Sequence, residues 1–264
     1  MQVIQNIRNY VVNPFIPRTS IEDSRYVVRF AQNHEEIEAA LKLRFEIFNL
    51  ELGEGLDSSF LTGRDCDRFD ATCHHLVVLE KSTDKIIGTY RVRTIEMAQT
   101  AQGFYSANEF ELRRLPPEVL EQSVELGRAC IARSHRDRQV LFLLWRALAR
   151  YTAEEGKRFL FGCCSLTSQD PTAGQQLLKQ LMNEGHMHSS FRINPRPGFE
   201  CEISDESLWP GEVELPRLFK TYLSIGAKVC GPPAIDRQFK TIDFFVIFDL
   251  LKMNDKTRRL LFGR

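Results

Sequence analysis

Charged side chains interrupt two of the more apolar segments of this 264-residue sequence. Glu125 and Arg128 lie in one segment with the alternation of a strand, and Arg91 and Arg93 lie on the same side of another. A carboxylate in such surroundings can accept a proton, and a guanidinium can bind a carboxylate through two parallel hydrogen bonds. An ion pair between Glu125 and Arg128 or Arg91 inside a sheet explains the same residues equally well, because a buried charge needs a partner.

A second group of charged residues surrounds the predicted first helix. Arg44 lies on its inner side beside Phe48, where an arginine belongs to an active site or to an ion pair. The polar loop that follows carries three acidic residues, Asp65, Asp67 and Asp70. These carboxylates could hold a cationic amine, or Arg64 and Arg68 could pin the loop through them. Their spacing does not match an EF-hand calcium loop.

The elements that must position these residues follow from hydrophobic periodicity. We predict strands at 27–31, 75–81, 86–95, 124–132, 159–165, 228–231 and 241–250, and helices at 35–52, 138–155, 171–182 and 214–225. A strand–helix–strand unit lies within an otherwise antiparallel series, which predicts an α/β (mixed α+β) fold with one mostly antiparallel sheet and helices on both faces. Residues 1–25 are interpreted as a leader, and 26–264 as a single domain with an insertion at 184–213.

Composition excludes several classes of protein. The 35 basic and 35 acidic residues give no net charge, so no nucleic-acid partner is expected. No apolar run is long enough to span a membrane, and the first residues do not resemble a secretion signal. Seven cysteines without a CxxC pair indicate reduced, mostly buried thiols in a cytoplasmic protein. No HExxH or GxSxG motif is present, and we predict no bound metal.

Six segments of the sequence carry a resemblance to a known family: LKLRFEIFNLELGEGLD, DRFDATCHHLVVLE, IIGTYRVR, GFYSANEF, VELGRACIARSHRDRQVLFLLWRALARY and CGPPAIDRQFKTIDFFVIFDLLKMN. They resemble the ornithine–acyl-carrier-protein N-acyltransferases of the acetyltransferase-like (GNAT) superfamily over nearly all of residues 26–264. A sparser pattern of residues resembles the acyl-homoserine-lactone synthases: Arg44, Phe48, Asp67, Asp70, Arg91, Glu125 and Arg128.

The resemblance implies a GNAT-like sheet with a splayed central strand pair and transfer of a long (3-hydroxy)acyl chain from a thioester to the α-amine of ornithine. This would be the first step of ornithine-lipid synthesis. Aminolysis of a thioester needs a deprotonated amine rather than a metal, so Glu125 is the predicted proton acceptor, with Arg128 as the second catalytic residue. The predicted substrate-binding residues are Arg44, Phe48, Asp67, Asp70, Arg91 and Arg93.

One departure from the superfamily pattern concerns the donor. Acetyl-CoA enzymes have a glycine-containing loop that cradles a pyrophosphate, whereas the turn at residues 133–139 contains no glycine. The phosphopantetheine of an acyl-carrier protein has one phosphodiester, which a helix N-terminus flanked by arginines can bind. The sequence therefore favours acyl-carrier protein as donor and partner over acyl-CoA, without a tightly bound cofactor. Three residues are predicted to bind it: Arg133, Arg136 and Arg138.

Several alternatives remain at this level. The acceptor could be glycine, lysine or another amine, which would make the chain an N-acyl amino acid synthase. A non-catalytic module that binds acyl-carrier protein or lipid would keep the same fold. An ester-forming acyltransferase is disfavoured, because no histidine begins an HxxxxD motif. The basic and apolar tail at 252–264 predicts peripheral contact with the inner face of the membrane.

Overall fold

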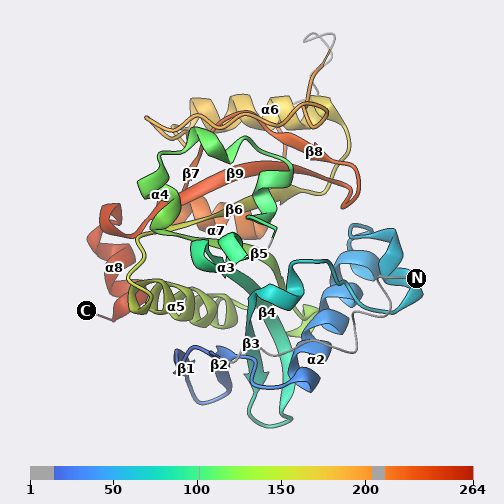
Figure 1. The fold of residues 1–264 in the computed structure, drawn as a ribbon, viewed down its shortest axis with the longest axis vertical. Helices are drawn as coiled ribbons and strands as arrows, with labels where there is room; N and C mark the ends of the chain where they lie inside the picture. The colour runs from blue at the N-terminus through green and yellow to red at the C-terminus, as the bar shows by residue number, and fades with distance from the viewer. Residues whose placement is uncertain (1–14, 101, 204–211, 264) are drawn as a thin grey trace.

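The computed structural model describes residues 15–100, 102–203 and 212–263. Among these residues, nine strands form one sheet in the order β1-β2-β3-β4-β5-β6-β9-β7, with β8 also paired to β9 (Figure 1). All pairs are antiparallel except β5 with β6. The strands are β1 Ser20–Glu22, β2 Tyr26–Phe30, β3 His74–Glu80, β4 Lys85–Thr94, β5 Ser123–Ile131, β6 Phe159–Leu166, β7 Lys228–Val229, β8 Ala234–Asp236 and β9 Thr241–Asp249.

Helices cover both faces of this sheet, as predicted. Leu76 and Val78 of β3 face the main apolar core, to which α5 contributes its buried side. Val77, which points to the opposite face, packs against α2 in a separate cluster. The helices are α2 His34–Phe45, α3 Ile95–Thr100, α4 Pro117–Glu121, α5 Arg138–Glu154, α6 Pro171–Asn183, α7 Arg217–Ile225 and α8 Asp255–Phe262.

Side-chain caps fix where helices α2 and α5 begin. Asn33 accepts a hydrogen bond from the backbone of Glu36 at the start of α2, and Asp137 accepts one from Val140 at the start of α5. Helix α2 continues as a π-helix at Glu46–Glu51. This wider turn shifts the buried stripe and faces Phe48 toward Phe239, whose ring centroid lies 5.3 Å away.

The central strands β5 and β6 separate along their length, and we call the V-shaped opening between them the fork. They pair only at Ser123–Phe159, Val124–Leu160 and Glu125–Phe161, although both strands continue for several residues. At the branch point, a Cβ on Gly162 would lie 2.2 Å from the carbonyl oxygen of Leu126, so only glycine permits the close approach before the strands diverge. The splayed strand pair predicted from the resemblance is therefore present.

The remaining segments show where sequence patterns were too weak. Residues 95–121, for which no element was predicted, form α3, short 3-10 turns and α4, and they contribute Phe104 and Phe110 to a second core over β6 and β9. Strand β1 lies inside the segment interpreted as a leader, and residues 1–14 of that segment lie outside the described residues. Within the predicted insertion, residues 184–203 make single bridges to β7 and β8, and 204–211 are not described. The division into leader, domain and insertion stays a prediction.

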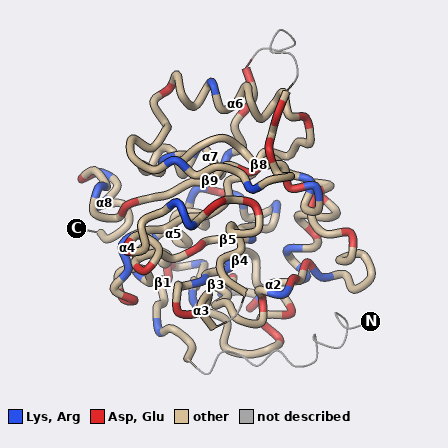
Figure 2. Tube along the Cα trace, turned by 45° about the horizontal axis from the view of Figure 1, so that its top comes forward, with Lys and Arg blue, Asp and Glu red and all other residues tan. Residues whose placement is uncertain are grey.

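Charges are interspersed over the fold, as Figure 2 shows for the acidic and basic residues along the trace. In the described residues, no helix combines the length and the apolar character that crossing a membrane requires. The C-terminal tail forms α8, which packs on α5 and buries Leu261 while Leu260 remains exposed.

Candidate active site

Three arginines and three aspartates form a buried ion-pair network on the α2 face of the sheet. The Arg44 guanidinium donates to Asp65 and to Asp70, at 2.7 Å each. Arg91 of β4 pairs with Asp67 at 2.6 Å and with Asp70 at 3.1 Å. Burial opposes the charge of Asp70, but Arg44 and Arg91 outweigh it and hold the pKa of this carboxyl well below its usual value. The network neutralises itself, because its three positive charges meet three negative charges.

The acidic loop is thus bound by arginines of α2, β4 and β5 and not by the arginines of the loop itself. Arg64 pairs with Glu38, and Arg68 donates to Asn108, so neither of them pins the aspartates. The carboxylates of Asp67 and Asp70 already accept bonds from strand and helix arginines. Their role as substrate-binding residues stays a prediction; in the structure their carboxylates orient the arginines.

Arg128 completes the network from a bulge in β5. Thr89 pairs with Cys130 and Arg91 with Gly127, so β5 has one more residue than β4 at this point. Arg128 takes up the extra length with a φ of 50°, a left-handed conformation that a non-glycine residue adopts rarely. Its guanidinium contacts Asp65 and Asp67 at 3.3 Å each, longer than the other pairs of the network.

Two aromatic rings hold the Arg128 guanidinium in place. Its central carbon lies 4.0 Å from the ring centroid of Phe239 and 4.8 Å from that of Tyr105. Burial opposes the charge of Arg128, but Tyr105, Asp65 and Asp67 outweigh it and raise its pKa. Arg128 is thus a fixed cation on the wall of the main cavity.

Glu125 lies at the base of the fork and takes its hydrogen bonds from a 3-10 turn rather than from an arginine. One carboxylate oxygen accepts from the backbone and hydroxyl of Ser106, at 2.7 Å each, and the other accepts from the backbone of Tyr105 at 2.8 Å. The ion pair with Arg128 or Arg91, which was the alternative interpretation of Glu125, is not found among the described residues. Burial raises the pKa of Glu125, and the bonds from Ser106 and Tyr105 oppose the rise.

Arg93 points to the same face as Arg91, as predicted, but its guanidinium binds the protein itself. It donates to the carbonyl oxygens of Gly103, Thr72 and Met97. Arg93 is therefore fully engaged in tying the 95–103 segment to the sheet, although it also borders the cavity.

A cavity of about 260 Å³ occupies the fork. It is lined by Glu125 and Arg128 of β5, by Arg91 of the neighbouring β4, and by Tyr222 and Leu218 of α7. A second cavity of about 270 Å³ runs from there along the unpaired edge of β5 to the start of α5. The two cavities share four lining residues: Phe48, Leu52, Ala129 and Leu218.

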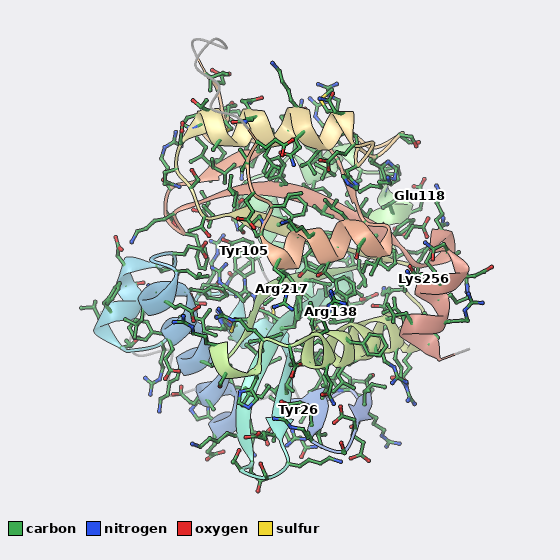
Figure 3. The ribbon with its side chains drawn as sticks, turned by 180° about the vertical axis from the view of Figure 1, so that it is seen from behind. Tyr26, Tyr105, Glu118, Arg138, Arg217 and Lys256 are labelled. Carbon is green, nitrogen blue, oxygen red and sulfur yellow. The ribbon has the colours of Figure 1, made fainter. Side chains whose placement is uncertain are left out.

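The outer end of this path is basic. Arg136 lines it beside the first turn of α5, and Arg133 and Arg138 are exposed close by. Arg217 lines both the second cavity and a third one, of about 650 Å³, that lies between α5, α7 and α8. Figure 3 shows Arg138 and Arg217 near one another at the beginnings of their helices. Sequence reasoning did not single out Arg217, which lies far from the other arginines in the chain.

The cavity in the fork also has acidic residues on its wall, which sequence reasoning missed. Glu54 and Asp243 line the cavity, and Glu109 lies against Asp243. Burial raises the pKa of Glu54 to about 7 and raises the pKa values of Glu109 and Asp243. Each of these acids is separated in sequence from the predicted site residues, so no local pattern marked it.

The splayed sheet, with a carboxylate at its branch point and a path to a helix N-terminus, defines an acyltransferase of the GNAT class. Residues 43–146 match the family described as an acetyltransferase (GNAT) domain. The AHL synthase LasI shares the fold at 16% identity and a TM-score of 0.50, over 91% of this chain and 96% of that one. FeeM, an N-acyl amino acid synthase from uncultured soil microbes, does so at 11% identity and a TM-score of 0.50, over 87% and 93%.

Curated relatives identify the family to which the chain belongs within this class of acyltransferases. The L-ornithine N(alpha)-acyltransferase of Brucella abortus (strain 2308) is 30% identical in an alignment of 250 residues that covers 87% of this chain and 86% of the relative. That of Rhizobium meliloti (strain 1021) is 29% identical in an alignment of 240 residues that covers 86% of this chain and 81% of the relative. The chain belongs to the L-ornithine N(alpha)-acyltransferase family and is an amide-forming acyltransferase.

Proposed function

We propose that this chain transfers a long (3-hydroxy)acyl chain from the phosphopantetheine of acyl-carrier protein to the α-amine of ornithine. This reaction is the first step of ornithine-lipid synthesis. The observation that carries the proposal is the continuous path from the basic start of α5 along the open edge of β5 to Glu125. The names of the relatives support ornithine as the acceptor.

The open edge of β5 suits a pantetheine arm. Beyond Glu125, β6 no longer pairs with β5, so backbone groups on that edge are left for the amides of the arm. The start of α5 favours a single phosphodiester over a pyrophosphate, because the Asp137 side chain already occupies the Val140 N–H and adds a negative charge there. Exposed Arg133 and Arg138 then supply positive charge to which an acidic carrier protein can bind.

The chemistry follows from the groups at the fork. Glu125 accepts a proton from the acceptor's ammonium, on the oxygen that takes only one hydrogen bond. The free amine attacks the thioester carbonyl; the new C–N bond forms as the C–S bond breaks, and the pantetheine thiol leaves with a proton. Arg128 is the arginine that the geometry favours for binding the acceptor carboxylate, because its own ion pairs are the longest in the network.

The rival acceptors are glycine and lysine, and the fold shared with an N-acyl amino acid synthase is compatible with them. The rival donor is acyl-CoA. We place the enzyme in the cytoplasm, where acyl-carrier protein is made and used, with peripheral contact to the membrane through the exposed face of α8.

The test offers the purified protein acyl-carrier protein or CoA loaded with one long acyl chain, together with a panel of amino acids, and identifies amides by mass. We expect acyl-ornithine from the carrier-protein donor. Product from acyl-CoA alone would overturn the donor assignment, and preferred acylation of glycine would overturn the acceptor. Arg138→Glu should slow transfer from the carrier protein but not from acyl-pantetheine, whereas Arg150→Glu, on the same helix, should change neither rate.

A further inference from the structure

Two buried carboxylates and a thiol meet beside the cavity that occupies the fork. The ligand atoms of Glu109, Cys163 and Asp243 all lie within 4.8 Å of one another. Glu109 is 1% exposed and Asp243 is 3% exposed. Oε1 of Glu109 and Oδ1 of Asp243 have no hydrogen-bond partner in the described part of the chain. Asp243 and Cys163 line the cavity, so the carboxylate of Asp243, with one oxygen unsatisfied, is at the wall of the space where substrate would bind.

No cation of the described residues forms an ion pair with this acidic group, although the charge of Arg128 opposes the rise in the pKa of Glu109. Arg44, Arg91 and Arg128 make ion pairs with the loop aspartates instead. Neither Glu109 nor Asp243 forms a salt bridge with a lysine, arginine or histidine among the residues described. Burial raises the pKa of both carboxyls, and Asp243 raises the pKa of Glu109 further, whereas the hydrogen bond with Glu109 lowers the pKa of Asp243. A cationic ligand bound between these two acids would supply the positive charge that the protein does not pair with them.

We propose that Asp243 and Glu109, with Glu54 on the neighbouring wall, bind the cationic side chain of the acceptor, namely the second ammonium of a diamino acid. The inference rests on the proposed function and names the residues that select the substrate. It replaces the loop residues Asp67 and Asp70, predicted for this role from the sequence, because their oxygens are already bound by arginines.

The position of the cluster relative to Glu125 supports this assignment. The Ser106 hydroxyl donates to Glu125 at 2.7 Å, and the Cys163 thiol donates to that hydroxyl at 3.5 Å. Cys163 in turn lies 4.0 Å from Glu109. The proton acceptor and the acidic cluster are thus two ends of one wall, built from β5, β6 and β9. A diamino acid has its α-amine and its second ammonium at the two ends of a short methylene chain.

A bound metal ion is the competing occupant of the same cluster. Burial raises the pKa of the Cys163 thiol well above its usual value, which disfavours the thiolate that a metal would need. The cluster also includes no histidine. An ammonium needs only hydrogen-bond acceptors and negative charge, which the two carboxylates supply.

The test compares ornithine with norvaline, which has the same carbon chain without the second amine. The wild-type enzyme should prefer ornithine in kcat/KM. Asp243→Asn and Glu109→Gln should each lower kcat/KM for ornithine by about 10- to 100-fold and leave the value for norvaline within about threefold, because one charge-assisted hydrogen bond is lost. Asp249→Asn, on the same strand but paired with Arg158 outside the cavity, is the matched control and should keep the preference.

Calorimetric binding of ornithine, measured without donor, gives a second readout that does not depend on turnover. We expect both variants to lose affinity for ornithine while circular dichroism stays that of the wild type; should Asp243→Asn not fold, Glu109→Gln carries the test. An unchanged ornithine preference in a folded variant, or an equal loss for both amines, would overturn the inference while acylation itself persists. Tight binding of Zn²⁺ to the wild type, together with loss of the preference for ornithine over norvaline when a chelator is added, would also overturn the inference. Acylation of neither amine, with ornithine binding intact, would refute the proposed function alone.

Discussion

The substitution Glu125→Gln replaces one oxygen of the carboxylate at the base of the fork by an amide nitrogen. In the structure both oxygens accept hydrogen bonds, one from the backbone and hydroxyl of Ser106 and the other from the backbone of Tyr105. A glutamine can turn its oxygen toward only one of these sides, so its NH₂ group must face an N–H donor on the other side. Leaving one buried donor unsatisfied should cost about 1–3 kcal/mol of the free energy of unfolding.

The effect on catalysis should be larger. Loss of a general base typically lowers kcat by about 10²- to 10⁴-fold, which corresponds to roughly 3–5 kcal/mol in activation free energy. Steady-state rates with ornithine and acyl-carrier protein between pH 6 and 9 would measure it, with urea unfolding as the check on folding. Because burial raises the pKa of Glu125, the wild-type rate should fall on the acid side as this carboxyl takes up its proton, and the variant should lack that limb.

Ser106→Ala is the matched control, since it keeps the carboxylate and removes one of its three hydrogen bonds. The lost bond had lowered the pKa of Glu125, so the acid limb should move to higher pH while the maximal rate falls only modestly. A folded Glu125→Gln enzyme with kcat within about threefold of the wild type, or with an unchanged acid limb, would refute the assignment of Glu125 as the base.

Three further substitutions test the scaffold. Burial raises the pKa of Glu54 from its ordinary value of 4.5 to about 7. The contribution of Glu54 to the free energy of unfolding is therefore present below pH 4.5 and is lost as pH rises through 7. In urea unfolding, Glu54→Gln should be more stable than the wild type by up to about 3 kcal/mol at pH 8, but not at pH 4. Arg44→Met leaves buried aspartates without their main partner and should cost about 3–5 kcal/mol in the same assay. Gly162→Ala should lower the melting temperature and cost about 1–3 kcal/mol, because its Cβ would meet the Leu126 carbonyl at 2.2 Å. Gly127→Ala, whose Cβ would meet nothing closer than 4.0 Å, should cost less; equal losses would contradict the role given to the branch point.

Local periodicity was sufficient for most of the elements that carry the site. The predicted helix at 138–155 is α5, Arg138–Glu154, and the predicted strand at 124–132 is β5, Ser123–Ile131. Both have long, regular apolar patterns that tertiary contacts reinforce. Residues 95–121 have no such pattern, since they form short turns whose apolar residues fill a core made by distant strands. Their structure depends on that core and could not be predicted from local sequence.

The assignment of the candidate site residues stays a prediction, but the structure shows their contacts. Arg91 and Arg128 line one cavity with Glu125, and Arg44 is joined to Arg91 through Asp70. An ion pair with an arginine was one of two interpretations of Glu125, and its carboxylate binds the 3-10 turn at Tyr105–Asn108 instead. The bulge that turns Arg128 inward has no sequence signal strong enough to predict it, because it depends on the register between two strands.

The sequence by itself determined the order of the elements, the absence of net charge and the membership of the acyltransferase class, because these depend on residue types and local spacing. Only the tertiary structure decided which charges meet. The loop aspartates lie against strand and helix arginines, whereas Glu109 and Asp243 meet beside Cys163 without an ion pair to any cation of the described residues. Partner choice among charged groups depends on distance and burial in the folded chain, and neither is encoded in any short stretch of residues.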